Sequence, residues 1–257
     1  MSGTVRYCYA VTRGLSPEAL TDERGVRGTP LEAVEADGLV AVTSPVDADE
    51  FSESALQKSL EDLNWLGEVA RAHNSVVERV AGLAVTLPLR LATIYLDADR
   101  VRSVLRSEEA AWTAALDRLD GRVEWGVKVY TVEQPEPAAP EPERPASGRS
   151  YLRQRLQARD SRDASMQDAT GSAEDVDGSL SALAHEHHRH RVQAQELSGV
   201  EGQNVLNAAY LVDADAQDAF LDRVTELREQ HTRCRIDVTG PWAPYSFAFD
   251  HTTSDAG

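Results

Sequence analysis

One acidic, proline-rich segment, residues 133–147 (EQPEPAAPEPERPAS), constrains the fold of this 257-residue chain more than any other feature. Proline has no backbone N–H donor and a fixed φ, so neither a helix nor a central strand survives there. The segment predicts an extended connector between two domains, residues 1–132 and 148–257. A proline-rich recognition motif is the weaker interpretation, because few basic residues flank it.

Apolar periodicity predicts an α+β domain before the connector. Val5, Tyr7, Tyr9 and Val11 alternate with smaller or polar residues, which is typical of a half-buried strand. An Asp-Gly pair at 37–38 predicts a tight hairpin. We expect two helices on one face of a mostly antiparallel sheet, in a modified ferredoxin-like sandwich. The predicted strands cover residues 5–11, 31–36, 39–43, 85–96 and 122–132, and the predicted helices cover residues 54–82 and 97–119.

The second half of the chain predicts a smaller α+β domain with a ferredoxin-like motif. Residues 151–159 are basic and helical in pattern. Residues 160–178 contain Gly171 and Gly178 and few large apolar side chains, which favours a flexible break. The remaining predictions are helices at 179–196 and 213–231, strands at 204–212 and 235–239, and an aromatic tail.

The formal net charge of −17 and the absence of long apolar runs exclude several classes of protein. No window approaches the 18 or so apolar residues of a membrane span. The negative charge opposes broad binding to nucleic acid or anionic lipid. The N-terminus has no basic region followed by an apolar run, so we expect a cytoplasmic protein. Two cysteines rule out a disulfide scaffold.

Histidines are the residues most suggestive of chemistry. His185, His187, His188 and His190 lie in a predicted helix, where two of them and a third ligand elsewhere could hold zinc. The order is not HExxH, because Arg189 stands where the second histidine would fall. We therefore favour a solvated helix face, and expect no metal, no cofactor and no catalytic residue. His73 lies on an apolar helix stripe and is more simply a core residue than a catalytic one.

Two groups of residues are candidates for binding a partner. Arg90, Glu124 and Lys128 project from the strand faces opposite the large apolar side chains, and Arg90 could pair with Glu124 if their strands are neighbours. This face is either an ordinary solvated surface or a docking surface. Near the C-terminus, the prolines at 241 and 244 stiffen a segment with Trp242, Tyr245, Phe247 and Phe249. We favour packing of this tail onto its own domain over an interface.

Five motifs stand in register over most of the chain: LPLRLATIYLD (87–97), EWGVKVY (124–130), GRSYLRQR (148–155), LNAAYLVD (206–213) and TGPWAPYSFA (239–248). Together they resemble the gas vesicle protein F/L family (GvpF/GvpL). The sequence departs from the family pattern at Leu91 and Ala92, where Phe-Gly is common, at Asn74, where an acid often stands, and at Ala243, which replaces a proline.

The resemblance implies a non-enzymatic protein of gas vesicle assembly, located in the cytoplasm and at the gas vesicle. Its partners would be the small hydrophobic shell subunit and other accessory proteins. A small-molecule-binding regulatory protein is the first alternative, because ferredoxin-like sheets also bind effectors. A metal-dependent enzyme using the His-rich helix and an RNA-binding sheet are further alternatives.

Overall fold

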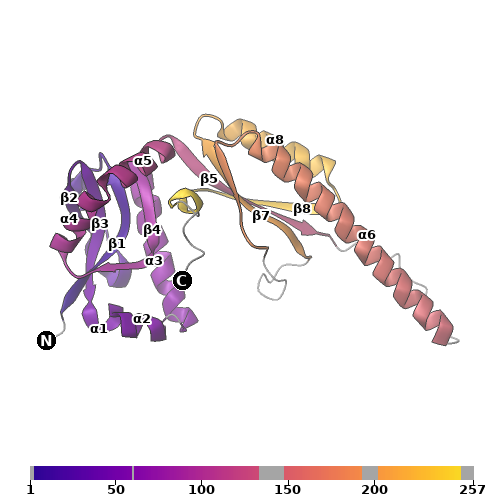
Figure 1. The fold of residues 1–257 in the computed structure, drawn as a ribbon, viewed down its shortest axis with the longest axis horizontal. Coiled ribbons are helices and arrows are strands. Elements are labelled where there is room, and N and C mark those ends of the chain that lie inside the picture. The colour runs from indigo at the N-terminus through magenta and orange to yellow at the C-terminus, as the bar shows by residue number, and fades with distance from the viewer. Residues whose placement is uncertain (1–2, 60, 133–147, 193–201, 250–257) are drawn as a thin grey trace. The chain divides into compact units, whose positions relative to one another are not determined.

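The computed structural model describes residues 3–59, 61–132, 148–192 and 202–249 (Figure 1). The predicted connector at 133–147 lies outside them. The chain forms two compact units: the first unit is Met1–Val123 with Trp242–Gly257, and the second unit is Glu124–Pro241. This division differs from the one expected from the connector, because the fifth strand falls almost entirely in the second unit and the C-terminal segment returns to the first.

The first unit is built on a four-stranded sheet in the order β2-β3-β1-β4, whose adjacent strands are antiparallel. The predicted hairpin is confirmed: Asp37 and Gly38 both have positive φ, and the flanking Ala36 pairs with Leu39. The strands are β1 (Thr4–Arg13), β2 (Glu32–Ala36), β3 (Leu39–Asp47) and β4 (Val85–Tyr95).

Both predicted helices of this unit are divided in two. Asp62 ends the first stretch, because its carboxylate accepts hydrogen bonds from the N–H groups of Asn64 and Trp65 and so starts a new helix. The second stretch breaks at Glu108. The helices are α1 (Ala48–Phe51), α2 (Glu53–Ser59), α3 (Leu63–Ala81), α4 (Ala98–Ser107) and α5 (Glu109–Leu119), with 3₁₀ turns η1 (Pro17–Leu20), η2 (Val26–Gly28) and η3 (Tyr245–Phe247).

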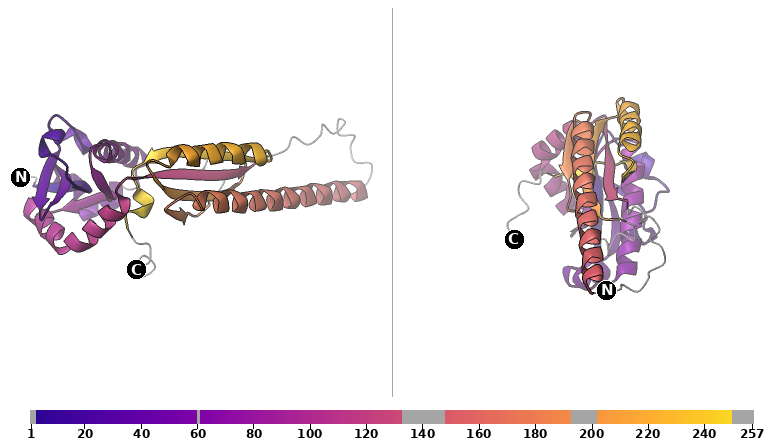
Figure 2. Two further views of the ribbon diagram at one scale, coloured as in Figure 1. Left: turned by 90° about the horizontal axis from the view of Figure 1, so that it is seen from above. Right: turned by 90° about the vertical axis from the view of Figure 1, so that its right-hand side faces the viewer.

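These helices cover both faces of the sheet, which corrects the prediction that they share one face. Ala10 of β1 packs in the core cluster that contains Val76 of α3. Arg13, three residues later on the same strand, points to the opposite face and pairs with Asp117 of α5 at 2.6 Å. Figure 2 shows α3 and the α4–α5 pair on opposite sides of the strands. A sheet buried on both faces reads as a continuous apolar run, which explains why β1 is buried almost throughout.

The second unit is built on a sheet in the order β6-β7-β5-β8. The predicted break at 160–178 is wrong: α6 runs without interruption through Gly171 and Gly178. The small residues Ala169 and Ala173, together with Val176, are buried on this helix, so close packing offsets the roughly 1 kcal/mol that each glycine costs. The elements are β5 (Arg122–Thr131), α6 (Gly148–Ser181), β6 (Glu186–Arg189), β7 (Asn204–Asp213), α8 (Gln217–Gln230) and β8 (Cys234–Trp242).

The predicted helix at 179–196 is also wrong, because His187 and His188 lie on a strand, and His185 and His190 flank it. Residues Glu186 to Arg189 pair antiparallel with β7, and the His185 N–H donates to the Leu211 carbonyl at 2.7 Å. Half-buried and exposed positions alternate along β6. That alternation has the period of a strand, which the run of polar residues hid in the sequence.

Candidate interaction surfaces

The C-terminal segment packs into the first unit, not onto the second half of the chain as predicted. Ala243 is 7% exposed and lies in the same apolar cluster as Tyr7 and Val76. Phe247 is 4% exposed, and its carbonyl accepts a hydrogen bond from Arg118 Nη2 at 2.7 Å. Trp242 differs, because 44% of it remains exposed. Of the tail aromatics, Trp242 therefore offers the most surface to a partner.

Two further side chains hold this segment in place. The Tyr245 hydroxyl donates to Asn74 Oδ1 of α3 at 3.1 Å. Asn74, which departs from the family pattern, thus has a structural role here. The guanidinium carbon of Arg90 lies 5.3 Å from the centre of the Phe249 ring, a cation–π contact. Arg90 accordingly belongs with the tail, in the first unit.

A buried polar cluster lies beneath the tail, centred on His73. The Ala92 N–H donates to Tyr7 Oη at 3.1 Å, which leaves the hydroxyl hydrogen for His73 Nδ1, also at 3.1 Å. Tyr9 Oη accepts from the Val26 N–H at 2.8 Å and lies 2.7 Å from Ser44 Oγ. All of these groups are neutral when His73 is neutral.

Burial lowers the pKa of His73 from 6.5 to about 4, and an interaction with the Leu89 backbone opposes this shift in part. His73 is 1% exposed, and its Nε2 has no partner of hydrogen-bond geometry within the residues described. The ring is therefore neutral at neutral pH. Its position among aromatic rings supports the prediction of a core histidine.

Ala92 stands where the family pattern commonly has glycine. Its φ is 60°, in the left-handed region that glycine adopts without strain. Its N–H nevertheless makes the bond to Tyr7, so the backbone holds this conformation. The glycine that the family commonly has there would relieve the strain.

The second sheet presents one face to its helices and the other face away from them. Trp125 and Tyr210 both contact Phe220 of α8, which identifies the helix side. Alternation along β5 and β8 places the following side chains on the opposite side, a set here called the β5–β8 face: Glu124, Lys128, Tyr130, Arg235 and Asp237.

On this β5–β8 face, a charged side chain lies over an aromatic ring. The Arg235 guanidinium lies 4.5 Å from the Tyr130 ring centre and pairs with Asp237 at 3.1 Å. Tyr130 is buried, whereas the side chains of Arg235 and Asp237 are 41% and 44% exposed. These three residues were not expected at this face from the sequence, although Arg235 and Asp237 alternate with the apolar Cys234 and Ile236 as strand residues do.

The condition for the suggested pairing of Arg90 with Glu124, that their strands are neighbours, is not met. Arg90 lies on β4 of the first sheet, whereas Glu124 and Lys128 lie on β5 of the second sheet. The two strands are not neighbours in any sheet. Glu124 and Lys128 do share the β5–β8 face, as the alternation predicted.

A buried ion pair joins three elements of the second unit. Asp177 of α6 is 3% exposed, and its Oδ2 accepts from Arg189 Nε of β6 at 2.6 Å. Its Oδ1 accepts from the Tyr210 hydroxyl of β7 at 2.5 Å. Burial raises the pKa of Tyr210, and the carboxylate beside it raises it further. Arg189, which interrupts the HExxH pattern, therefore has a structural partner.

The histidines of β6 are divided between the two sides of the sheet. The His187 ring stacks over Tyr210 at 6.4 Å, whereas His188 and His190 meet at 4.8 Å. Across the described ranges, no three His, Cys, Asp or Glu side chains converge as metal ligands would. The strand geometry removes the helical two-histidine site that the zinc hypothesis required.

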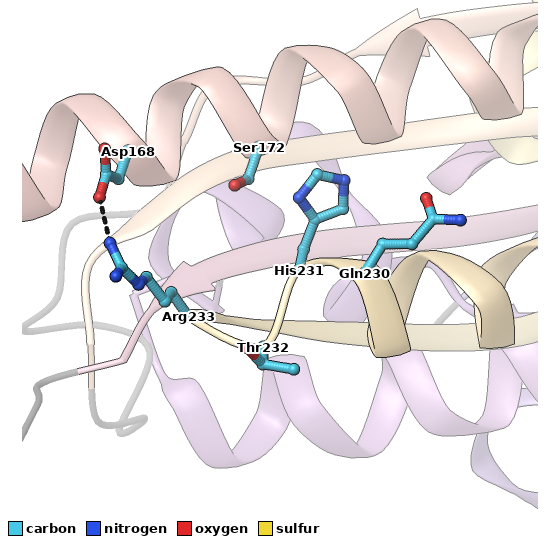
Figure 3. A pocket seen from close by; sticks show the side chains of 6 residues that line it. All are labelled: Asp168, Ser172, Gln230, His231, Thr232 and Arg233. Atoms are coloured by element: carbon cyan, nitrogen blue, oxygen red, sulfur yellow. Dashed lines mark hydrogen bonds and ion pairs between the residues drawn. The ribbon is translucent and has the colours of Figure 1, made fainter.

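A polar hollow of about 330 Å³ lies between α6 and the turn that follows α8 (Figure 3). An ion pair between Arg233 Nη1 and Asp168 Oδ2, at 2.8 Å, crosses its rim. His231 Nε2 is 3.4 Å from Asp175 Oδ2, and they form an ion pair only when the ring is protonated. Acidic and basic groups are balanced, so the hollow suits a small polar molecule better than a simple anion. Its lining residues are Asp168, Ser172, Gln230, His231, Thr232 and Arg233.

Among the residues described, no helix is both long enough and apolar enough to cross a membrane.

Comparison with known proteins gives consistent matches over nearly the whole chain. The family model described as gas vesicle synthesis protein GvpL/GvpF matches residues 5–248. Gas vesicle protein L of Streptomyces sp. (strain CB03234) is 45% identical, with 98% of each chain covered. Gas vesicle protein F2 of Halobacterium salinarum is 26% identical over 85% of this chain and 87% of that protein.

Two crystal structures share the fold at low sequence identity. The gas vesicle protein GvpF from Anabaena sp. PCC7120 is 19% identical and superposes with a TM-score of 0.68, covering 96% of this chain and 97% of that one. GvpF from Microcystis aeruginosa is also 19% identical, with a TM-score of 0.63 and coverage of 95% and 99%. The two-unit α+β architecture is thus that of the GvpF structures.

Proposed function

Because the chain belongs to the gas vesicle synthesis protein GvpL/GvpF family, we propose that it is an accessory protein or minor component of gas vesicle assembly. It binds the small hydrophobic shell subunit and other accessory proteins in the cytoplasm and at the gas vesicle. The observation that carries this proposal is the family match, which spans both units.

The β5–β8 face is the surface we assign to this binding. It combines the half-buried Lys128 and the partly exposed charges of Arg235 and Asp237 with the buried ring of Tyr130. A hydrophobic shell subunit aggregates unless a partner keeps it dispersed, and a charged protein with a limited apolar surface can do so. Trp242, which is 44% exposed in the first unit, is a second candidate contact for the shell subunit. Arg90, Tyr245 and Phe247 contribute indirectly, by holding the C-terminal segment in the first unit.

The role we propose is binding without turnover. The polar hollow beside His231 favours one alternative, a regulatory protein that binds a small molecule. A ligand that binds only the folded state raises the unfolding temperature, and the rise grows with the logarithm of its concentration, so a thermal-shift screen of polar metabolites tests that alternative.

Co-purification of the chain with the shell protein tests the main proposal. We expect Lys128→Glu combined with Arg235→Glu to reduce the bound shell protein about tenfold or more, because both cations of this face change sign. The matched control is Arg100→Glu with Arg106→Glu on α4, which changes the net charge by the same amount and should bind normally. Unchanged binding by the β5–β8 variant would remove this surface from the proposal.

A further inference from the structure

Helix α6 extends far beyond the sheet on which it packs. It spans Gly148–Ser181, and at 1.5 Å per residue its 34 residues measure about 51 Å. The first buried side chain among those described is Ala169, so the preceding part, about 30 Å long, projects from the second unit. Figure 1 and Figure 2 show this N-terminal half of α6 leaving the sheet behind. We call residues 148–163 the arm.

The stripe that packs on the sheet continues into the arm, but its chemistry changes. The buried residues Ala169, Ala173, Val176 and Leu180 recur every three or four positions. The same spacing, extended toward the N-terminus, reaches arginines at 159 and 155. Arg155 and Arg159 are exposed, and 58% of the neighbouring Leu156 is exposed. The arm therefore offers a basic stripe beside an apolar side chain.

The arm is basic, although the chain as a whole is acidic. It contains five arginines and two aspartates, whereas the chain has a net charge of −17. Its length exceeds the Debye length of about 8 Å at physiological ionic strength several-fold. An acidic surface can therefore meet the end of the arm beyond the range of most charges on the sheet of the second unit.

The first unit carries an acidic surface, in which Arg27 pairs with two of the carboxylates, Glu50 and Glu68. Seven acidic residues and one lysine lie between positions 47 and 68. Trp65 Nε1 donates to Glu50 Oε1 at 2.8 Å, which holds α1 against the start of α3, so these acids share one region. Leu63 lies among them and is 80% exposed, and Glu53 and Glu61 beside it are exposed too. We call this region the acidic patch.

We propose that the arm of one copy docks on the acidic patch of a second copy of this chain, with the arginines of the arm against the carboxylates and Leu156 near Leu63. The contact joins two different surfaces, so each copy keeps one arm and one patch for further association. This inference stands on the arm and the patch alone and does not depend on the proposed role in gas vesicle assembly.

Sedimentation velocity of the purified full chain tests this inference. We expect association that increases with protein concentration at physiological ionic strength and weakens at high ionic strength. Arg155→Glu with Arg159→Glu should weaken self-association about tenfold or more, because exposed charge pairs contribute up to about 1 kcal/mol each and reversal makes them repulsive. The matched control is again Arg100→Glu with Arg106→Glu, which should associate as the unmodified chain does.

A charge swap separates a specific contact from general repulsion. Glu53→Arg with Glu61→Arg reverses the acidic patch, and this variant alone should also lose self-association. Mixed in equal amounts, the arm variant and the patch variant should associate, because each arm then meets a patch of opposite charge. A monomeric unmodified chain at all concentrations, an arm variant that associates normally, or a mixture that stays monomeric would overturn the inference. Circular dichroism identical to that of the unmodified chain confirms that each variant is folded.

Discussion

The two units of this molecule bury polar side chains in opposite ways. In the first unit, His73 and its tyrosine neighbours form a cluster that is neutral and covered by the C-terminal segment. In the second unit, Asp177 and Arg189 form an ion pair between a helix and an edge strand. A neutral cluster is stable only while its titratable member stays uncharged, whereas a buried ion pair is stable only while both partners are present. We therefore expect acid to destabilise the first unit, and removal of one charged partner to destabilise the second.

The largest effect we expect is that acid destabilises the first unit. Because the pKa of His73 falls from 6.5 to about 4 on folding, the unfolded chain binds the proton more tightly. The free energy of unfolding is therefore highest above pH 6.5 and falls as pH drops toward about 4, by roughly 3 kcal/mol in all. Urea unfolding as a function of pH measures this loss.

His73→Phe is the control for this experiment, because phenylalanine fills a similar volume and does not titrate. The variant should show a clearly shallower pH dependence between the two pKa values, whatever its stability at neutral pH. An equally steep dependence in the variant would show that His73 stays accessible to protons in the folded unit.

Removing a charged partner should have the next largest effect, confined to the second unit. Arg189→Met leaves the Asp177 carboxylate buried with only the Tyr210 hydroxyl as partner. We expect a loss of about 2–3 kcal/mol in unfolding free energy, below the full range for buried pairs because the arginine is 57% exposed. Asp177→Leu combined with Arg189→Met should recover part of it, because no buried charge remains. Additive losses in the double variant would contradict coupling between the two residues.

The smallest effect should be a gain in stability in the first unit. Ala92→Gly removes the strain of a residue at φ 60° and keeps the N–H that bonds to Tyr7. We expect a stabilisation of about 0.5–1 kcal/mol by thermal unfolding. Ala111→Gly in α5 makes the same chemical change at an ordinary helical position and should destabilise by a similar amount. A destabilised Ala92→Gly variant would mean that the β-carbon contributes more packing than the backbone strain removes.

The difference between the units also explains which features could be predicted from the sequence. Strict alternation identified β5, and the Asp-Gly pair identified the β2–β3 hairpin, because both signals are local. The continuity of α6 could not be predicted, since Gly171 and Gly178 are tolerated only through packing on the sheet. The histidines of β6 belong to a strand because β7 supplies hydrogen-bond partners, which no local pattern reveals.

The candidate surfaces could likewise be predicted only where the signal is local in the sequence. Alternation placed Glu124 and Lys128 on one face, and the structure adds Arg235 and Asp237 from β8. The separation of Arg90 from that face depends on strand order, and the return of Tyr245 and Phe247 to the first unit depends on long-range packing. Neither is encoded in spacing along the chain.

Gas vesicle formation in cells that lack this chain is the most direct measurement of its role. With transcription of the shell subunit intact, we expect electron microscopy to show absent or misshapen vesicles, and cells that no longer float. The unmodified chain should restore flotation, and the folded Lys128→Glu, Arg235→Glu variant should not. Normal vesicles and normal flotation without the chain would contradict an assembly role, and full rescue by that variant would contradict the surface assigned to it.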